Sequence, residues 1–147
     1  MRKGGWYMAI WQFYCNIISS TKNSDILSRD ELISWKDIPL PGYNIDFLKC
    51  EKSWAKNIVQ YGNIDETCIE FIFCKDKLDE ILCRLDLRTL TKYMLDQIVE
   101  YVKNIEACFL VEDMIYPPEI QTMISVLMKS RANEFCRNPL GYIKSLK

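Results

Sequence analysis

The sequence predicts an α+β fold, with a mostly antiparallel sheet of about four strands and helices packed on one face of that sheet. Three observations support this prediction. Short segments rich in β-branched and aromatic residues are bounded by polar turns, as in the strands of a hairpin. Longer segments repeat apolar residues every three or four positions, as in helices that bury one side. A chain of 147 residues with 49% hydrophobic content suits one globular domain with its own core.

The N-terminal part of the chain is predicted to begin with a leader and a strand. Because Gly4 and Gly5 interrupt the start of the sequence, we expect residues 1–7 to be a frayed leader and residues 8–147 to form the single α+β domain. From residue 9 to residue 18 the chain is aromatic and β-branched and contains no helix breaker. This composition predicts the first strand.

A short helix is predicted next, because Ser28 and Glu31 have the spacing of a capping box. The helix should run for about two turns, to about Trp35, because the prolines that follow lack the amide donor that a helix needs. Between residues 43 and 61, the spacing of the apolar residues predicts one or two further helical turns.

The middle of the chain is predicted to form an antiparallel hairpin. Residues 67–74 and 78–87 are rich in strand-forming residues and are joined by a short polar turn. Side chains alternate along a strand, so one face of the second strand carries Ile81, Cys83, Leu85 and Leu87, and the other carries Glu80, Leu82, Arg84, Asp86 and Arg88. We therefore expect the first face to join the core and the second to be mostly charged.

The C-terminal part of the chain is predicted to be mainly helical. A helix is expected over residues 90–104, because its apolar residues form one stripe. A short apolar strand follows at 106–112, and a second helix should begin after residues 117–118, since proline is tolerated in a first turn. Asn138 and the proline after it predict a last short helix that ends at residue 146.

Most familiar catalytic and nucleic-acid-binding chemistries lack their usual residues. The chain has no histidine, which removes the commonest general base and every nucleophile pair that contains histidine. It contains no glycine-rich phosphate loop and no nucleophile elbow motif. We therefore expect no catalytic residues, no cofactor and no enzymatic activity. The net charge of -1 argues against binding to nucleic acid.

The seven cysteines favour a reducing compartment. They include no Cys-x-x-Cys pair, so neither a metal site nor a disulfide framework is expected. Most lie within apolar stretches, where a free cysteine acts as a small buried hydrophobe. We expect a cytoplasmic protein that does not bind membranes, because no run approaches the roughly 18 apolar residues that a membrane span requires.

The most specific charge cluster is the sequence Arg84-Leu85-Asp86-Leu87-Arg88. Alternation places its three charged residues on one side of a strand. Two interpretations remain open. The two guanidinium groups can form a platform for a ligand or partner, because each binds carboxylates or phosphates in a forked geometry. Alternatively, the residues form an ordinary outward face in which Asp86 neutralises its neighbours.

Four segments resemble a family of small, largely uncharacterised bacterial proteins. These segments are Trp-Gln-Phe-Tyr (11–14), Trp54 followed by Tyr-Gly-Asn-Ile-Asp (61–65), Arg-Leu-Asp-Leu-Arg (84–88) and the C-terminal sequence 130–143. The family is similar in size and α+β build to the immunity proteins of contact-dependent bacterial competition. The resemblance implies a protein that binds a cognate toxin stoichiometrically and blocks it. It implies no catalytic residue.

The resemblance also implies a partner surface. Many toxin domains are basic nucleases, so an acidic patch on this protein is expected to face such a partner. Trp35 and Tyr43 flank the proline-rich loop and are candidates either for this surface or for the core. The candidate partner-binding residues are Asp30, Glu31, Trp35, Asp37, Tyr43, Asp46, Arg84, Asp86 and Arg88.

Two alternatives to a toxin inhibitor remain open. The first is a structural or regulatory module that forms a homodimer through the methionine-rich helix at 119–129. The second is an enzyme that uses Asp86 with Arg84 and Arg88 on a small anionic substrate.

Overall fold

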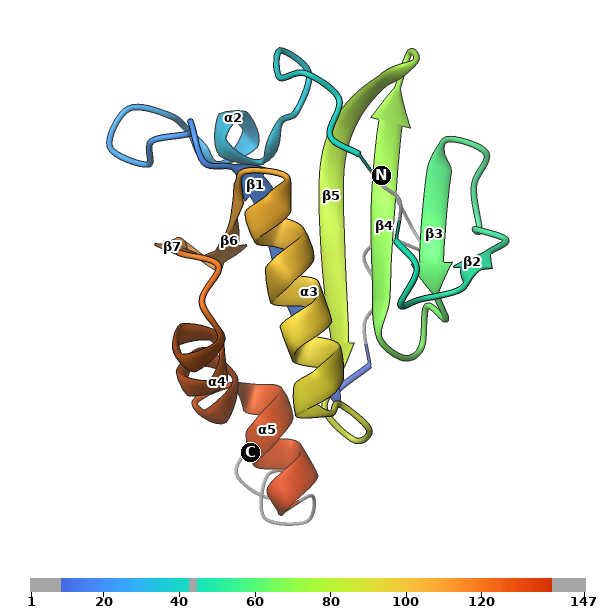
Figure 1. The fold of residues 1–147 in the computed structure, drawn as a ribbon. Coiled ribbons are helices and arrows are strands. Elements are labelled where there is room, and N and C mark those ends of the chain that lie inside the picture. The colour runs from blue at the N-terminus through green and yellow to red at the C-terminus, as the bar shows by residue number, and fades with distance from the viewer. Residues whose placement is uncertain (1–8, 43–44, 139–147) are drawn as a thin grey trace.

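The computed structural model describes residues 9–42 and 45–138, and its centre is an antiparallel sheet with helix α3 (Lys92–Asn104) in front of it (Figure 1). The strand order is β2-β3-β4-β5-β1-β6-β7. The strands are β1 (Gln12–Ser19), β2 (Cys50–Glu51), β3 (Ile58–Gly62), β4 (Cys68–Cys74), β5 (Lys77–Asp86), β6 (Ala107–Val111) and β7 (Met114–Tyr116). The helices are α2 (Arg29–Ile33), α3 (Lys92–Asn104), α4 (Ile120–Met128) and α5 (Arg131–Arg137). The predicted leader at 1–7 and the predicted last helix at 139–146 lie outside the described residues.

The α+β class and the antiparallel sheet are confirmed, but the sheet has seven strands and not about four. The four predicted strands are its centre: β4, β5, β1 and β6. The missed strands β2, β3 and β7 have two, five and three residues and lie at or next to the edges of the sheet. Strands β2 and β7 carry too few residues to show a clear alternation. Strand β3 is as long as the predicted β6, but it lies in the segment whose apolar spacing predicted helical turns.

The helical turns predicted between residues 43 and 61 are wrong for the described part of that segment, which forms β2 and β3. These strands pair with Cys50 opposite Tyr61. Strand β3 ends at Gly62, whose φ of +89° is unfavourable for any residue with a side chain. A Cβ atom at Gly62 would lie 2.2 Å from the carbonyl oxygen of Thr67. The turn into β4 therefore requires glycine at this position.

The predicted hairpin is confirmed as β4 and β5. Cys74 pairs with Lys77, and the two residues between them, Lys75 and Asp76, both have positive φ values, 51° and 68°. Positive φ at both positions is the type I′ geometry, whose twist matches the twist of the flanking strands. The register shifts between Ile72 and Phe73, where a bulge adds one residue, Asp79, to the facing part of β5.

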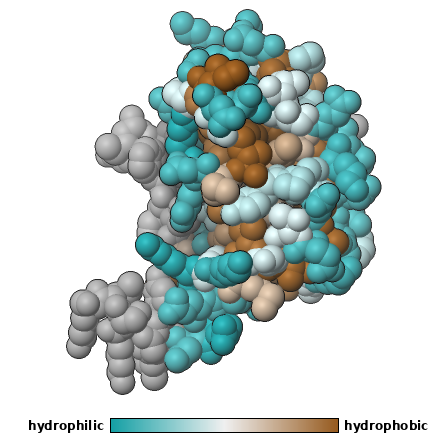
Figure 2. Space-filling view, turned by 90° about the vertical axis from the view of Figure 1, so that its left-hand side faces the viewer, coloured by the Kyte–Doolittle hydropathy of each residue, from teal (hydrophilic) through white to brown (hydrophobic). Residues whose placement is uncertain are grey.

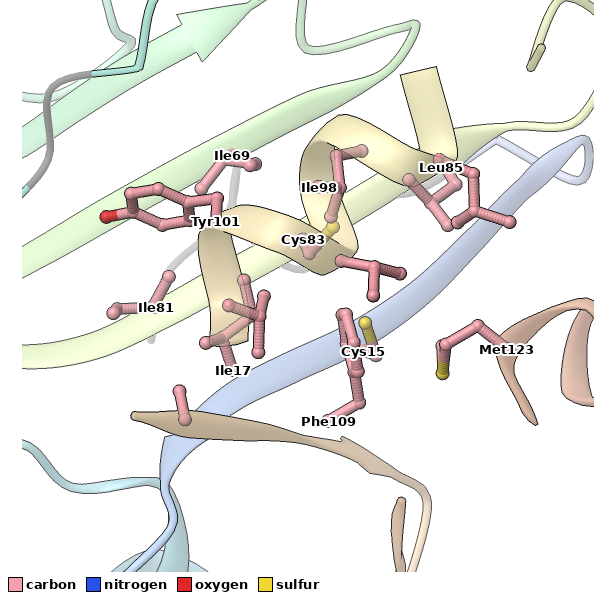
Figure 3. Packing of buried hydrophobic residues seen from close by; sticks show 14 of the residues in the cluster. Cys15, Ile17, Ile69, Ile81, Cys83, Leu85, Ile98, Tyr101, Phe109 and Met123 are labelled. Carbon is pink, nitrogen blue, oxygen red and sulfur yellow. The ribbon is translucent and has the colours of Figure 1, made fainter. Parts of the chain in front are cut away.

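The main core lies between α3 and one face of the sheet. Ile98 and Tyr101 of α3 face Ile69, Ile81 and Cys83 of the sheet, as Figure 3 shows. The N-terminus of α3 is capped by Thr91, whose hydroxyl accepts a hydrogen bond from the backbone N–H of Met94 at 3.1 Å. Full burial of a side chain such as Ile98 contributes about 1.5–3 kcal/mol. The predicted helix and its apolar stripe are therefore confirmed.

The other helices do not all lie on this face. Met123 and Leu127 of α4 and Ala132 of α5 join the main core. By contrast, Leu32 of α2 packs with Ile18 and Leu110, which alternation places on the opposite face of the sheet. The capping box is confirmed, but α2 has five residues and not two full turns. Helix α5 was not predicted. Among the described residues, none of the helices has both the length and the apolar character that crossing a membrane requires.

Candidate functional site

Five of the buried polar side chains on the sheet face opposite α3 belong to connected polar networks. They are Asn16, Glu70, Glu80, Arg84 and Asp86. They reach this face because their neighbours along the strands point into the main core. All five are buried, so the predicted alternation in β5 is confirmed, whereas the interpretation of its charged face as a solvated surface is wrong.

Arg84 of β5 forms an ion pair with Glu70 of the neighbouring strand β4. Its Nε atom donates to Oε1 of Glu70 at 3.2 Å, and neither side chain is exposed. The second carboxylate oxygen of Glu70 accepts a hydrogen bond from the indole N–H of Trp54, also at 3.2 Å. A buried carboxylate needs such partners, because transfer of an unpaired charge out of water costs several kcal/mol. Arg84 therefore serves this network and does not form a platform for a ligand.

Asp86 is paired with Arg88 at the end of β5. Nε and Nη2 of Arg88 donate to the two carboxylate oxygens of Asp86 at 3.0 and 2.9 Å. Strand β5 ends at Asp86, so Arg88 folds back from the following turn, and its guanidinium carbon lies 3.9 Å from the ring centre of Trp11. The hydrogen bonds from Arg88 to Asp86 raise the pKa of this arginine. The self-paired interpretation is therefore correct for Asp86 and Arg88.

A third polar chain links this face to α2. The Nδ2 group of Asn16 donates to Oε1 of Glu80 at 2.9 Å. Oδ1 of the same Asn16 accepts a hydrogen bond from Nη2 of Arg29 at 3.4 Å, and Nη1 of Arg29 donates to the backbone carbonyl of Glu112. Arg29 therefore bridges α2, the centre of β1 and the turn between β6 and β7.

A cleft of about 640 Å³ lies beside this bridge. It exists because β6 pairs only with residues 16–19 of β1, which leaves the first half of β1 next to α4, α5 and β7. The inner lining includes Phe13, Val126 and Ala132. The remaining lining residues are Gln12, Tyr14, Arg29, Val111, Glu112, Met114, Tyr116, Lys129, Ser130 and Arg131. Figure 2 views the side that carries β7 and α4, where hydrophobic patches lie among hydrophilic ones.

The sequence did not predict this cleft, because its lining comes from six elements that are spread along the chain: β1, α2, β6, β7, α4 and α5. The excess of five basic over one acidic side chains in residues 129–147 was the only signal at its C-terminal side. No feature of the sequence indicated that Arg29 would line this cleft, because Arg29 directly precedes Asp30 and Glu31, which were candidates for the acidic patch.

The predicted acidic residues are exposed, whereas Trp35 beside them is buried. Asp30 and Glu31 lie in the first turn of α2, Asp37 follows this helix, and Asp46 precedes β2. Trp35 is buried in the main core, and its indole N–H donates to the carbonyl of Ile17 at 2.9 Å. We therefore correct the assignment of Trp35 to a partner surface. Tyr43 lies outside the described residues.

All seven cysteines are outside disulfides, and three of them are fully buried: Cys15, Cys68 and Cys83. Burial raises the pKa of the Cys68 thiol, and a hydrogen bond with Cys15 raises that of Cys83. Cys50 and Cys74 are exposed, which the sequence did not predict for Cys74. Within residues 9–42 and 45–138, no group of three or more cysteine, aspartate or glutamate side chains is arranged to hold a metal ion.

Comparison with models of protein families, with curated proteins and with solved structures gives no match to this chain. Interpretation of the site therefore depends on its own geometry. The described residues offer two exposed regions of distinct chemistry: an acidic and apolar surface around α2, and a cationic cleft beside β1.

Proposed function

We propose that this protein is an immunity-type inhibitor, which binds a bacterial toxin domain stoichiometrically and blocks its activity. The observation that carries the proposal is a surface formed by α2 and its flanking loops, which we call the α2 surface: Ile26, Asp30, Glu31, Asp37 and Leu40. Ile26 and Leu40 are 78% and 57% exposed, although both are large apolar side chains. Apolar anchors among charged residues are typical of protein interfaces.

The α2 surface is held rigidly from below. Leu32 is buried against Ile18 and Leu110, and Trp35 is buried in the main core. The backbone N–H of Trp35 also donates to the carbonyl of Asp79 at 2.9 Å. A surface ordered before binding loses little conformational entropy when it meets a partner, which favours tight association.

Exposed acids on this surface suit a partner with a basic active site. Complementary charge accelerates association and discriminates against wrong partners more than it adds affinity. We therefore expect the apolar anchors to set the lifetime of the complex and the acids to set its rate of formation. The same acids surround the exposed apolar side chains of Ile26 and Leu40, and this arrangement limits aggregation of the unbound protein.

The proposal is tested by capture of the partner followed by an assay of its toxicity. The tagged protein retains partners from a lysate of the source cells, and each retained protein is expressed in a sensitive host with and without the inhibitor. We expect a toxic partner, restored growth and a one-to-one complex by calorimetry. A retained protein that is harmless, or toxicity that the inhibitor leaves unchanged, contradicts the proposal.

Paired variants locate the interface. Ile26→Asp with Leu40→Asp should weaken binding by about 100-fold or more, because each anchor of an interface contributes about 2 kcal/mol. Tyr93→Asp is the matched control, because Tyr93 is 68% exposed and α3 begins at the opposite end of the sheet (Figure 1). Charge reversal of Asp30, Glu31, Asp37 and Asp46 should slow association and weaken its salt dependence. Unchanged association would remove the acids from the interface.

Self-association is a second candidate function, favoured by one observation. Met128 is 66% exposed beside a cleft of about 280 Å³ between α3 and α4, whose apolar lining includes Leu90 and Ile124. The apolar side chains of α4, the methionine-rich helix, nevertheless mostly pack in or against the main core: Met123 and Leu127 are buried, and Ile120, Ile124 and Val126 are partly buried. Light scattering tests this candidate: a dimer that Met128→Asp converts to a monomer supports it, and a wild-type monomer of 17.4 kDa contradicts it.

A further inference from the structure

The cleft beside β1 concentrates positive charge that the described part of the chain does not neutralise. Arg29, Lys129 and Arg131 line it together with one acid, Glu112, which gives a formal charge of +2 in a chain of net charge -1. Among residues 9–42 and 45–138, none of the three cations forms an ion pair with a carboxylate. Three like charges around one cleft repel one another, and an anion bound there would relieve this repulsion.

Arg29 is fixed in position before any ligand binds. Its Nη1 and Nη2 atoms donate to the carbonyl of Glu112 and to Oδ1 of Asn16. Asn16 is itself buried and held by Glu80, so the orientation of the guanidinium group is set from the centre of the sheet. Both acceptors are neutral, and a guanidinium group has five N–H donors. Three donors and the whole positive charge of Arg29 are therefore left for a ligand.

The inner part of the cleft is apolar. Phe13, Val126 and Ala132 belong to or pack against the main core, and Tyr14 and Tyr116 add aromatic side chains to the lining. The volume of about 640 Å³ lies within the range of small-molecule sites. From the charged rim and the apolar interior we infer that the cleft binds a small organic anion, in which a carboxylate or phosphate group is attached to an aromatic or apolar body. This inference is independent of the α2 surface.

Titration of the ¹⁵N-labelled full chain, followed by NMR, tests the inference with defined probes. Phenyl phosphate carries both parts of the expected ligand, inorganic phosphate only the charge, and phenol only the apolar body. We expect phenyl phosphate to shift the amides of the cleft saturably and to bind at least tenfold more tightly than either fragment. Benzoate decides between carboxylate and phosphate, and saturable binding of either at the cleft supports the inference.

A pair of variants on one helix provides the specificity control. Arg131 lines the cleft, whereas Arg137, at the other end of α5, does not. Arg131→Gln should weaken phenyl phosphate binding about tenfold, as expected for loss of a charged hydrogen-bond donor. Arg137→Gln should change it less than twofold. Thermal unfolding confirms that each variant is folded, and Lys129→Gln provides a second cleft variant if Arg131→Gln is not.

Three results would overturn the inference. The first is equal binding of phosphate and phenyl phosphate, which would show that charge alone is recognised. The second is equal weakening by Arg131→Gln and Arg137→Gln, which would show a diffuse electrostatic effect. The third is shifts that stay linear to about 10 mM or spread over the whole sheet, because a built site of this size should saturate below that concentration.

Discussion

Arg84 and Glu70 form an ion pair in which both side chains are completely buried, on neighbouring strands at the centre of the sheet. The pair is held further by the indole of Trp54, which donates to the second oxygen of Glu70. A pair of this kind contributes little net stability compared with a well-packed apolar pair, because both ions must lose their hydration. Its main effect is that substitution of either partner lowers the stability of the fold, because the other partner loses its opposite charge.

Glu70→Gln should therefore be strongly destabilising. The substitution keeps the shape of the side chain but removes the carboxylate charge that faces the buried guanidinium group of Arg84, which should cost about 3 kcal/mol or more. Urea unfolding measures this loss as a shift of the midpoint at unchanged slope. Asp96→Asn is the matched control, because the pair of Lys92 and Asp96 is exposed and should contribute about 0.5 kcal/mol or less. Equal losses in the two variants would show that the buried pair is unimportant.

The capping box of α2 should make part of the stability depend on acid pH. Hydrogen bonds from the backbone N–H and hydroxyl of Ser28 lower the pKa of Glu31. A carboxyl whose pKa is lower in the folded state stabilises the fold above its unfolded pKa, and this contribution is lost as pH falls through the folded value. Ser28→Ala should cost about 1 kcal/mol at pH 7 through loss of the cap.

The difference between wild type and Ser28→Ala should shrink between pH 7 and pH 3, because protonated Glu31 accepts hydrogen bonds poorly. Urea unfolding at several pH values measures this difference. Ser24→Ala is a suitable control, because Ser24 lies in the preceding exposed loop. A difference that stays constant with pH would show that Glu31 does not take part in the cap.

The extent to which the sequence predicted this fold depended on segment length. Strands β1, β4, β5 and β6 have five to ten residues, enough for alternation and β-branched composition to be recognised. The type I′ turn at Lys75 and Asp76 was recognisable only as a polar break, because neither residue is glycine. Helix α5 was missed because its seven residues bury only Ala132 and so show no apolar stripe.

The candidate site was harder to predict, because burial is a tertiary property. Alternation placed Arg84 and Asp86 correctly on one face, but it could not show that this face is closed to solvent. Trp35 gave the same difficulty, since its position beside the proline-rich loop left both the surface and the core open, and its side chain enters the core. The cleft lined by Arg29 and Arg131 required the three-dimensional arrangement of elements about 100 residues apart.

The seven thiols should separate into groups by their reactivity. Cys50 and Cys74 are exposed and should react rapidly with a disulfide reagent at pH 8. Cys15, Cys68 and Cys83 are buried, and the raised pKa of Cys68 and Cys83 keeps these two thiols protonated. The three buried thiols should react only when the protein unfolds. Ellman's titration with and without 6 M guanidinium measures this separation, and rapid reaction of Cys83 in the native protein would contradict the buried pair with Cys15.

The same raised pKa values predict a loss of stability at alkaline pH. A thiol whose pKa is higher in the folded state contributes stability that is present below its unfolded value and lost as pH rises above it. Cys68→Ala should therefore flatten the fall in stability between pH 8 and pH 10. Cys50→Ala is the control, because Cys50 is exposed and its removal should leave the slope unchanged. Identical slopes in all three proteins would show that Cys68 does not contribute.

Trp35 offers a way to separate the core from the proposed partner surface. Trp35→Phe removes the hydrogen bond to the carbonyl of Ile17 and leaves a cavity, so it should cost about 2 kcal/mol in unfolding free energy. Because the side chain is buried below the α2 surface, the folded variant should bind the captured partner within about twofold of wild type. Ile26→Asp should do the reverse, with little loss of stability and a large loss of affinity. The affinity is measured at a temperature at which the variant is folded. A large loss of affinity in folded Trp35→Phe would contradict the assignment of Trp35 to the core alone and would show that its side chain also contributes to partner binding.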